Sequence, residues 1–531
     1  MGVDQPARDP GGPELPEDAA GRRVSCDGER ATVRYVGPVP PTEGLWLGVE
    51  WDKPERGKHD GSHNGVQYFT CRHPTGGSFL RPAKVSFGVD YVTVVREQYG
   101  LDVQAVLSEK LCVSSRTVEW SRLRAPRLDD LTSVSVDNRE VNGPGNVDEI
   151  QQTTGNVQSL DLGRNLLSSW DDVAAITAQM DKLEELLLSD NRLRLPSDPC
   201  TQSHAFSSLK VLALNSCALT WPQILHCAPM WPQLEELCVS QNDITELQRP
   251  VDVLQSLKSL DVSINPLVEE TVLSLAALPR LEKLNLAKTG LSSLRFDDAP
   301  PGGKTAMFPS LQYLILDNNS SITEWGVVDE LAKLQSLVEL SCRCSGLTSS
   351  DGKLQTVNQL FIAKLGQLEH LNRLEILPED RRGAELDYIK MFGEEWLKAG
   401  GHPDAQQSQP STQFTSQHPR YLSLIHKYGA PEEGELKKQQ PFALKNHLIK
   451  VTFVFPDQAD RKPIEKKLPV SMLVQKVKGL LYRLLKVPAA ELKLTYTSCK
   501  IEGKEIEIDS DLKPLGFYSI EEGDQVLVRW S

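Results

Sequence analysis

The stretch Val157-Gln158-Ser159-Leu160-Asp161-Leu162-Gly163-Arg164-Asn165-Leu166-Leu167 sets the pattern on which most of this chain is built. Leu160 and Leu162 alternate with polar residues, as in a short strand that buries one face. Asn165 follows the strand, where its carboxamide can satisfy backbone groups as the chain turns. The stretch therefore predicts a short strand that ends in a tight turn.

The same frame, L-x-x-L-x-L-x-x-N-x-L, recurs from about residue 131 to residue 377. Further copies begin at Leu183, Leu209, Leu234, Leu257, Leu281 and Leu311, a degenerate copy begins at Leu337, and a worn first copy begins at Leu131. Cys217 and Thr289 occupy the Asn position in two of the copies. Repetition of this frame resembles the leucine-rich repeats, which implies stacked units in a curved α/β solenoid. The leucines are then core residues and not a site.

A solenoid of this kind offers the exposed positions of its strands as one concave face. The candidate residues on that face carry mixed charge and one aromatic ring: Glu184, Glu185, Glu235, Glu236, Lys258, Lys283 and Tyr313. We expect this face to bind a protein partner and not a small ligand. The alternative is ordinary solubilising charge.

A second informative stretch is Gly57-Lys58-His59-Asp60-Gly61, which continues to Phe69. Glycine is favoured where the backbone turns with positive φ or approaches a ligand closely. A Lys on such a loop, with Trp46, Tyr68, Phe69 and Phe79 nearby in sequence, predicts a groove with a cationic end and aromatic walls. Such a groove suits an acidic peptide that ends in an aromatic residue and a free carboxylate. The alternative is a solvated turn in a small β domain.

The segments 31–37, 44–50, 57–69 and 79–82 together resemble a CAP-Gly domain, whose signature is GKNDG. His59 stands in the Asn position of that signature, which puts the contribution of this residue in question and introduces a pH-sensitive group. The resemblance implies a small β domain over 21–96 that binds the acidic, aromatic-terminated tails of α-tubulin and related proteins. The residues that it implicates are Trp46, Gly57, Lys58, His59, Asp60, Gly61, Asn64, Phe69, Phe79 and Arg81.

Two features bound the strands of this β domain. The prolines of the stretch Pro38-Val39-Pro40-Pro41 predict that a strand ends there, because proline cannot donate to a ladder. The valines between Val85 and Val95 predict a closing strand or a lead-out segment. Residues 1–20 are rich in Pro, Gly and acids and are expected to be disordered, and 97–130 are expected to form a connector.

The C-terminal part divides into three further segments. A charged helix over 378–400 is expected to cap the repeats, and 401–440 are expected to be a linker with a short packed element near Tyr421. Residues 441–531 follow the order β-β-α-β-β and resemble ubiquitin, which implies an α+β (β-grasp) domain. The chain ends Arg529-Trp530-Ser531 and lacks a terminal Gly-Gly, so a conjugated modifier is not expected. Thr495 stands where ubiquitin presents its recognition Ile, so the apolar docking patch is not expected either.

The composition argues against several classes of protein. The 58 Lys+Arg against 72 Asp+Glu give a net charge of −14, which argues against a dedicated nucleic-acid binder, although residues 21–96 carry eleven Lys/Arg against eight Asp/Glu. The ten cysteines form no CxxC pair and indicate reduced thiols. No apolar run approaches the roughly 18 residues of a membrane span. We therefore expect a protein of the cytoplasm.

Catalytic and metal-binding motifs are incomplete. Pro301-Gly302-Gly303-Lys304-Thr305 has the end of a phosphate loop, but Asp298 stands where its first glycine is needed. The stretch Asp261–Asn265 begins like a calcium loop, but Pro266 occupies the glycine position. We expect no enzyme activity, no cofactor and no metal.

The order of the three modules resembles the tubulin-folding cofactors. This resemblance implies a chaperone of α-tubulin that acts with tubulin cofactors B, C and D and a small Arf-like GTPase in the assembly and dissociation of the α/β heterodimer. It also implies a contact with the proteasome or the ubiquitin pathway through the last domain. Two alternatives stay open: a microtubule-associated scaffold, and a ubiquitin-pathway adaptor for tubulin turnover.

Overall fold

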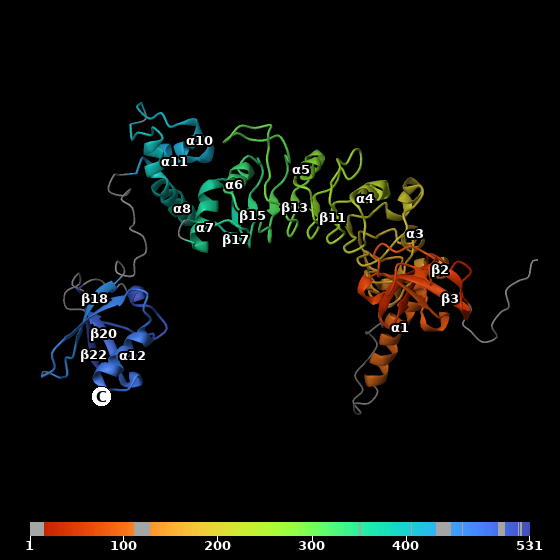
Figure 1. Ribbon diagram of the computed structural model, residues 1–531, viewed down its shortest axis with the longest axis horizontal. Helices are drawn as coiled ribbons and strands as arrows, with labels where there is room; N and C mark the ends of the chain where they lie inside the picture. The colour runs from red at the N-terminus through yellow and green to blue at the C-terminus, as the bar shows by residue number, and fades with distance from the viewer. Residues whose placement is uncertain are drawn as a thin grey trace, which may run out of the picture. The chain divides into compact units, whose positions relative to one another are not determined.

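Four antiparallel strands in the order β1-β2-β3-β6 form the first sheet of the computed structural model (Figure 1). The structure describes residues 15–110, 128–349, 352–404, 406–431, 448–458, 460–497, 505–518, 520 and 523–530. The sheet consists of β1 (Arg23–Cys26), β2 (Glu29–Val39), β3 (Thr42–Trp51) and β6 (Gly77–Leu80), and a separate hairpin of β4 (Ser62–His63) and β5 (Val66–Gln67) carries the loop region. A small core that includes Val24, Val33 and Val49 holds the sheet together.

Strand β2 extends into the proline-rich stretch. Pro38 pairs with Leu45 and Val39 with Thr42, across a shift in the register. Proline is tolerated at such an irregular strand end because the ladder there needs no donor from it. The strand ends at Val39, within the stretch where the prolines predicted its end, although Pro38 and Val39 still belong to the ladder.

The predicted closing strand is a helix, α1 (Tyr91–Lys110). Asp90 caps it, with its Oδ1 accepting the Thr93 N–H at 3.0 Å. Tyr91, Val92 and two further valines of its first turns are buried in the core of the middle region and not in that of the first sheet. The β domain therefore ends near Asp90, inside the predicted range 21–96.

The sequence predicted two irregular segments near this domain, a disordered terminus over 1–20 and a connector over 97–130. Residues 1–14, most of the predicted disordered terminus, lie outside the described residues, whereas Ala19 is buried and Leu15 packs on the small core. Within the predicted connector 97–130, α1 extends to Lys110, residues 111–127 lie outside the described residues, and Leu128 packs on the middle core.

The middle region is a sheet of eleven short strands, β7 to β17, in sequence order. Neighbouring strands are parallel from β7 to β16, and β17 turns back antiparallel to β16. The strands are β7 (Ser133–Ser135), β8 (Ser159–Asp161), β9 (Glu185–Leu187), β10 (Val211–Ala213), β11 (Glu236–Cys238), β12 (Ser259–Asp261), β13 (Lys283–Asn285), β14 (Tyr313–Ile315), β15 (Glu339–Ser341), β16 (His370–Leu371) and β17 (Leu374–Glu375). Strands β7 to β15 each fall on one copy of the frame, and β16 and β17 follow the last copy.

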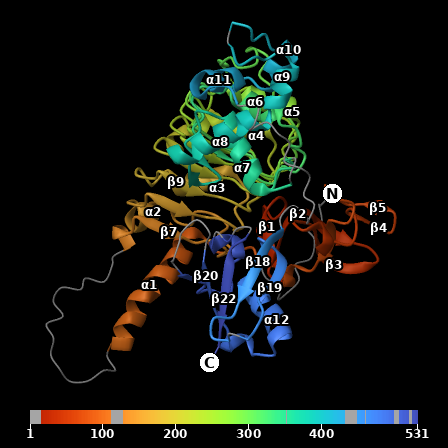
Figure 2. The same ribbon diagram turned by 90° about the vertical axis from the view of Figure 1, so that its left-hand side faces the viewer.

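Helices follow several of these strands, and Figure 1 shows α4, α5 and α6 on one side of the row. The helices are α2 (Val147–Thr154), α3 (Trp170–Thr177), α4 (Trp221–Cys227), α5 (Glu269–Val272), α6 (Gly326–Leu331) and α7 (Leu354–Lys364). The frame leucines and these helices share one continuous core that runs from Tyr91 to Leu371. Figure 2 shows α1 beside β7 and α2 at the start of the sheet. Tyr99 of α1 covers the outer edge of β7 by accepting the Ser135 N–H at 2.9 Å.

The frame asparagines join one repeat to the next. Asn265 is fully buried; its Oδ1 accepts the N–H groups of Asn242 and Ile244 at 2.9 and 3.0 Å. Its Nδ2 donates to the carbonyls of Val239 and Val262 at 3.0 and 2.9 Å. One side chain thus satisfies backbone groups of two successive units, which a buried turn requires.

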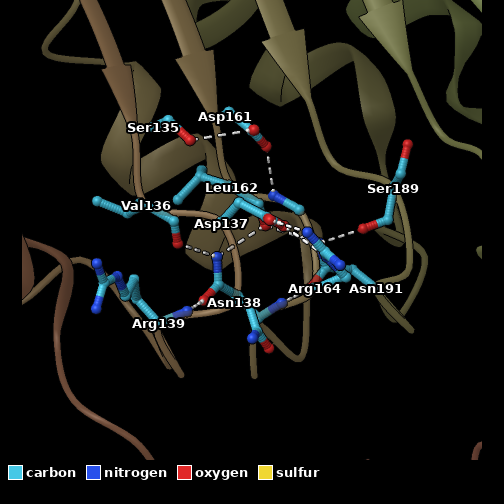
Figure 3. A network of polar contacts seen from close by, with 12 residues as sticks. Ser135, Val136, Asp137, Asn138, Arg139, Asp161, Leu162, Arg164, Ser189 and Asn191 are labelled. Carbon is cyan, nitrogen blue, oxygen red and sulfur yellow. Dashed lines mark hydrogen bonds and ion pairs between the residues drawn. The ribbon is translucent and has the colours of Figure 1, made fainter.

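The residue immediately before the Asn position of the frame has a left-handed backbone conformation. This holds in seven consecutive copies, at Arg164, Asp190, Ser216, Gln241, Ile264, Lys288 and Asn318. Each of these residues donates its N–H to a carbonyl of the following unit, as Ile264 does to Ala287 at 2.8 Å. In the first units a side-chain network adds to these bonds, in which Arg164 pairs with Asp137 and Ser135 donates to Asp161 at 3.2 Å (Figure 3).

The last strands are covered by α8 (Pro378–Met391), α9 (Gly393–Lys398), α10 (Thr412–Gln417) and α11 (Tyr421–Tyr428). Phe414, Tyr421 and Leu424 are buried with Tyr388 and Trp396 in one cluster. The predicted linker 401–440 was therefore too wide: its first part is a packed extension of the cap, because its aromatic residues have a surface to bury against. Residues 432–440 lie outside the described residues.

Residues 433–531 form a separate compact unit. Its sheet has the order β19-β18-β22-β20-β21, with β18 and β22 parallel, and α12 packs its apolar residues into the same core. The elements are β18 (Leu448–Val454), β19 (Ile464–Pro469), α12 (Val474–Leu485), β20 (Lys493–Thr497), β21 (Glu505–Glu507) and β22 (Gln525–Arg529). This is the predicted ubiquitin-like arrangement, and the short strand β21 is an addition to the predicted order β-β-α-β-β.

Candidate peptide-binding groove and sheet face

The loop that carries Lys58 is fixed to strand β6 through its backbone. Lys58 and His59 both donate their N–H groups to the carbonyl of Gly77, at 2.7 and 3.2 Å. Gly77 returns its own N–H to the carbonyl of His59 at 2.7 Å. The Lys58 side chain is therefore presented from a rigid loop.

Two glycines make this loop possible. A Cβ on Gly57 would lie 2.0 Å from the carbonyl oxygen of Thr75, and a Cβ on Gly61 would lie 2.0 Å from that of Phe69. Gly61 also has a φ of +102°, which favours glycine. The close approach that the sequence suggested for these glycines is thus to the chain's own backbone.

Phe79 is the centre of an aromatic cluster beside the loop. Its ring is stacked with the His59 ring at 5.0 Å, and the other rings meet it edge to face: Phe69 at 5.5 Å, Tyr68 at 5.4 Å, His63 at 6.2 Å and Tyr35 at 6.4 Å. Gly48 lies beneath the cluster, where a Cβ would come within 2.5 Å of the Phe69 ring. We call this set of six rings the Phe79 cluster.

Trp46 and Arg81 form a pair of their own. The Arg81 guanidinium lies 3.8 Å from the centre of the Trp46 ring and donates to the carbonyls of Glu43 and Leu45 at 2.9 and 3.2 Å. The Trp46 Nε1 donates to Thr42 at 3.0 Å. The pair braces the start of β3, and among the described residues the ring contacts of Phe79 do not include Trp46.

The other predicted groove residues have distinct places. Lys58 is exposed, and no described residue pairs with its ammonium group. Asp60 accepts the N–H and the hydroxyl of Ser62 at 3.0 and 2.5 Å, and these bonds lower the pKa of its carboxyl. Asn64 has a φ of 48° and forms the two-residue hairpin turn with Gly65, the typical Asn-Gly turn. Lys58 is thus the group of this loop that stays available to a ligand.

His59 is neutral at physiological pH. Its Nδ1 accepts the N–H of Gly61 at 3.0 Å, and burial lowers the pKa of its imidazole below the ordinary 6.5, against the opposing effect of Asp60. Protonation would remove the acceptor that Gly61 uses. A histidine with a lowered pKa stabilises the folded loop above pH 6.5 and loses that contribution as the pH falls below it.

We therefore expect peptide affinity to be constant between about pH 7 and pH 8 and to fall below about pH 6. A titration of peptide binding across this range measures it. In the variant H59N the decline at low pH should be absent, because an amide does not titrate. An equal decline in the variant would assign it to another group.

On the exposed face of the large sheet, the residues just before four successive strands alternate in the sign of their charge. Lys210 pairs with Glu184 at 2.7 Å and Lys258 with Glu235 at 2.8 Å. The hydrogen bond from Lys258 lowers the pKa of Glu235. These pairs join neighbouring units, so Glu184, Glu235 and Lys258 are already engaged.

The remaining predicted face residues lie one position further along the strands. Glu185 accepts the hydroxyl of Ser159 at 2.5 Å, whereas Glu236 is exposed. Lys283 lies 5.5 Å from the centre of the Tyr313 ring, on adjacent strands. Glu236, Lys283 and Tyr313 are therefore the residues of this set for which the described residues show neither an ion pair nor a side-chain hydrogen bond.

The β domain and the sheet are joined by direct contacts. Glu140, at the turn after β7, accepts the hydroxyls of Ser25 and Ser86 at 2.5 and 2.8 Å. The backbone of Val89 bonds to Glu140 and Asn142 at 3.0 and 2.9 Å. The groove is thereby attached to the first repeats.

Comparisons with known proteins agree with this architecture. Residues 20–85 match the model of the CAP-Gly domain family. A curated relative, tubulin-specific chaperone E of Danio rerio, is 60% identical over 97% of this chain and 99% of its own length. This chain belongs to the tubulin-specific chaperone E family. The Homo sapiens member is 50% identical over 97% of this chain and 99% of its own length.

One solved structure covers the second unit of this chaperone E family member. The solution structure of the C-terminal ubiquitin-like domain of mouse tubulin-specific chaperone E is 56% identical, covers 16% of this chain and 88% of that chain, and has a TM-score of 0.16. The predictions of a CAP-Gly domain and a ubiquitin-like domain are confirmed by the family match and by the topology of the two sheets.

Residues 301–305, which resemble the end of a phosphate loop, have a structural role in this protein. The Lys304 ammonium donates to the carbonyl of Ala332 at 2.7 Å, and Thr305 donates to Asp298 at 2.6 Å. Within the described ranges, three or more His, Cys, Asp or Glu side chains nowhere gather as a metal would require. Across the same ranges, none of the helices has the length and apolarity needed to cross a membrane.

The residues predicted for the groove do not include two rings of the Phe79 cluster or the glycine beneath it. Tyr35 and His63 belong to the Phe79 cluster, and Gly48 lies beneath it. Tyr35 precedes the Gly37 of the CAP-Gly-like segment and Gly48 lies on the strand opposite Phe79, so a pairing of β3 with β6 would have found the glycine.

Proposed function

We propose that this chain is a non-catalytic tubulin-folding chaperone whose CAP-Gly groove binds the carboxyl-terminal tail of α-tubulin. The observation that carries the proposal is the exposed ammonium of Lys58, free of described partners, on a rigid loop beside the Phe79 cluster. A carboxylate and an aromatic side chain at the end of one peptide match these two features. The family relationship supports tubulin as the source of the peptide.

The large sheet supports a second contact with tubulin or with a sister cofactor. We assign residues 131–377 to a leucine-rich-repeat solenoid, on the basis of the frame, the parallel strands and the buried asparagines. Its exposed face presents Tyr313 beside Lys283, and tyrosine is enriched where protein interfaces gain most of their energy. Tubulin cofactors B, C and D and a small Arf-like GTPase are the partners that we propose for the remaining surfaces.

The ubiquitin-like unit supports a contact with this machinery more than with ubiquitin receptors. Thr495, at the position of the recognition Ile, accepts a hydrogen bond from Arg529 at 3.0 Å. Arg529 also pairs with Glu505 at 2.9 Å. This face is therefore polar where a ubiquitin receptor needs an apolar patch, which disfavours the ubiquitin-pathway alternative.

Several modest contacts in one chain explain how a chaperone could act on a stable heterodimer. Once the tail is bound, the other surfaces meet tubulin at a raised effective concentration, and the combined affinity gains about 10²–10⁴-fold. Binding energy spread over α-tubulin then competes with its interface to β-tubulin. We place this activity, in assembly and in dissociation of the heterodimer, in the cytoplasm and at the cytoskeleton.

The variant K58A tests the proposal. Loss of a charge-assisted hydrogen bond should weaken binding of an α-tubulin tail peptide by roughly 10-fold or more, since such a bond contributes about 1.5–3 kcal/mol. Calorimetric titration of the full chain with the peptide measures it. The control is K84A, because Lys84 is exposed on the same domain but outside the loop. Unchanged affinity in K58A would remove Lys58 from the site.

A further inference from the structure

A cleft of about 660 Å³ lies at the far end of the repeats, but its buried lysines are bound to protein oxygens, as Lys364 is to Asp329 at 2.8 Å. A second cleft, of about 570 Å³, lies between the CAP-Gly domain and the early repeats and differs in this respect. Arginines line both of its walls: Arg34 and Arg72 from the domain, Arg192 and Arg194 from the repeats. We call it the arginine cleft.

The carboxylates on the domain wall are used within the protein. Glu50 Oε2 accepts both Nε and Nη2 of Arg34 at 2.8 and 2.7 Å, and its Oε1 accepts the backbone N–H of Arg72 at 2.7 Å. Asp52 is likewise bound to the buried Arg23 at 2.6 Å. Neither carboxylate is left to neutralise the other arginines.

Three guanidinium groups of the cleft keep their charge uncompensated by an ion pair. Arg72 and Arg194 are exposed, and neither forms an ion pair with a described carboxylate; Asp18, which interacts electrostatically with Arg194, pairs with Arg22 at 2.8 Å. Arg192 donates to the carbonyl of Ser216. This bond satisfies one of its donors, but a neutral carbonyl does not balance the positive charge of the guanidinium group. Asp243 is the other carboxylate on the cleft wall, so positive charge is in excess there.

The arginine cleft lies next to the start of strand β6, to which the loop of Lys58 is bound. Gly76 lines the cleft, and the next residue, Gly77, binds the backbone of Lys58 at 2.7 Å. The contacts of Glu140 with Ser25 and Ser86 hold the two walls together. A peptide that ends at Lys58 therefore has a cationic surface close to its path.

We propose that the arginine cleft binds the acidic stretch that precedes the carboxyl end of the same peptide, an inference that rests on the proposed function of the groove. Guanidinium groups match carboxylates in geometry as well as in charge. Leu193 and Leu195 on the repeat wall give the cleft apolar surface. That surface and the net charge of −14 favour a peptide over a nucleic acid.

The test uses the full chain, the double variant R192A/R194A and two peptides. The long peptide has a run of glutamates before a carboxyl-terminal tyrosine, and the short one keeps only the tyrosine and the residue before it. We expect the double variant to bind the long peptide about 10-fold more weakly at low salt, with a smaller dependence on salt, and to bind the short peptide as the parent chain does. R249A, an exposed arginine outside the cleft, is the control.

The outcomes separate the cleft from the groove. Unchanged affinity for the long peptide in the double variant would overturn the inference, and so would an equal loss for both peptides. If the parent chain binds neither peptide, or if K58A affects neither, the proposed function of the groove fails first. A loss confined to the long peptide supports the cleft.

Discussion

Replacement of Asn265 by alanine is expected to lower the free energy of unfolding by about 3–4 kcal/mol in the compact unit that contains the repeats. The side chain is fully buried, and its loss would leave the N–H groups of Asn242 and Ile244 and the carbonyls of Val239 and Val262 without their partner. Each buried polar group left unpaired costs roughly 1–3 kcal/mol, and partial access of water reduces the sum. Urea unfolding followed by circular dichroism measures the loss.

The control for this variant is N285A. Asn285 lies on the outer sheet face, where its Nδ2 donates to Asp261 at 2.8 Å and its Oδ1 accepts the N–H of Ala287 at 3.1 Å. Solvent can replace both bonds, so the loss should stay below about 1 kcal/mol. If N265A were no more destabilised than N285A, the buried asparagines would not be what joins the repeats.

The second large effect is expected at Glu385 of α8. This fully buried carboxylate accepts Arg420 at 2.7 Å, Lys427 at 2.9 Å and Tyr428 at 2.8 Å, and so holds α11 against the cap. In E385Q the charge is lost while the shape is kept. We expect a loss of about 2–3 kcal/mol, below the usual range for buried pairs because Lys427 is half exposed. Limited proteolysis within residues 406–431 should become faster.

The same residue predicts an acid-sensitive cap. Burial by itself raises the pKa of Glu385, but hydrogen bonds from Lys427, Arg420 and Tyr428 outweigh burial and hold the pKa below the ordinary 4.5. A lowered carboxylate pKa stabilises the folded state above pH 4.5, and this contribution is lost as the pH falls through the folded pKa. Proteolysis at decreasing pH should therefore accelerate in the parent chain and in E394Q, an exposed control on α9, but much less in E385Q.

The regular parts of the fold were predictable because one physical pattern governs them. Leu160, Leu186 and Leu212 are fully buried at the centres of strands that pair in register, and most of their neighbours on these strands are only half-buried. The residues that form the core can therefore be identified from the sequence pattern. The ubiquitin-like elements other than β21 were predicted for the same reason. The left-handed backbone at Ile264 was not, because a β-branched residue is unfavourable there and only the bond to Ala287 explains it.

The errors occurred where tertiary packing overrides local composition. Val92, Val94 and Val95 favour a strand locally, but they lie in α1 because that helix buries them against the repeats. The polar segment after residue 400 has the composition of a linker, yet Phe414 and Tyr421 anchor it. At the predicted groove, the sequence identified the loop and Phe79, whereas the pairing of Trp46 with Arg81 is visible only in three dimensions.

The contact of Tyr99 with Ser135 at the outer edge of β7 has a consequence for the whole sheet. An uncovered edge strand presents free N–H and C=O groups to other molecules and promotes edge-to-edge association. Tyr99 accepts the Ser135 N–H at 2.9 Å, and Gln98 donates to the Ser135 carbonyl at 3.0 Å. At the other edge, β17 turns back on β16. Helix α1, which follows the β domain, thus also prevents edge-to-edge association of the large sheet. Removal of that domain together with α1 would expose the edge of β7 and promote aggregation.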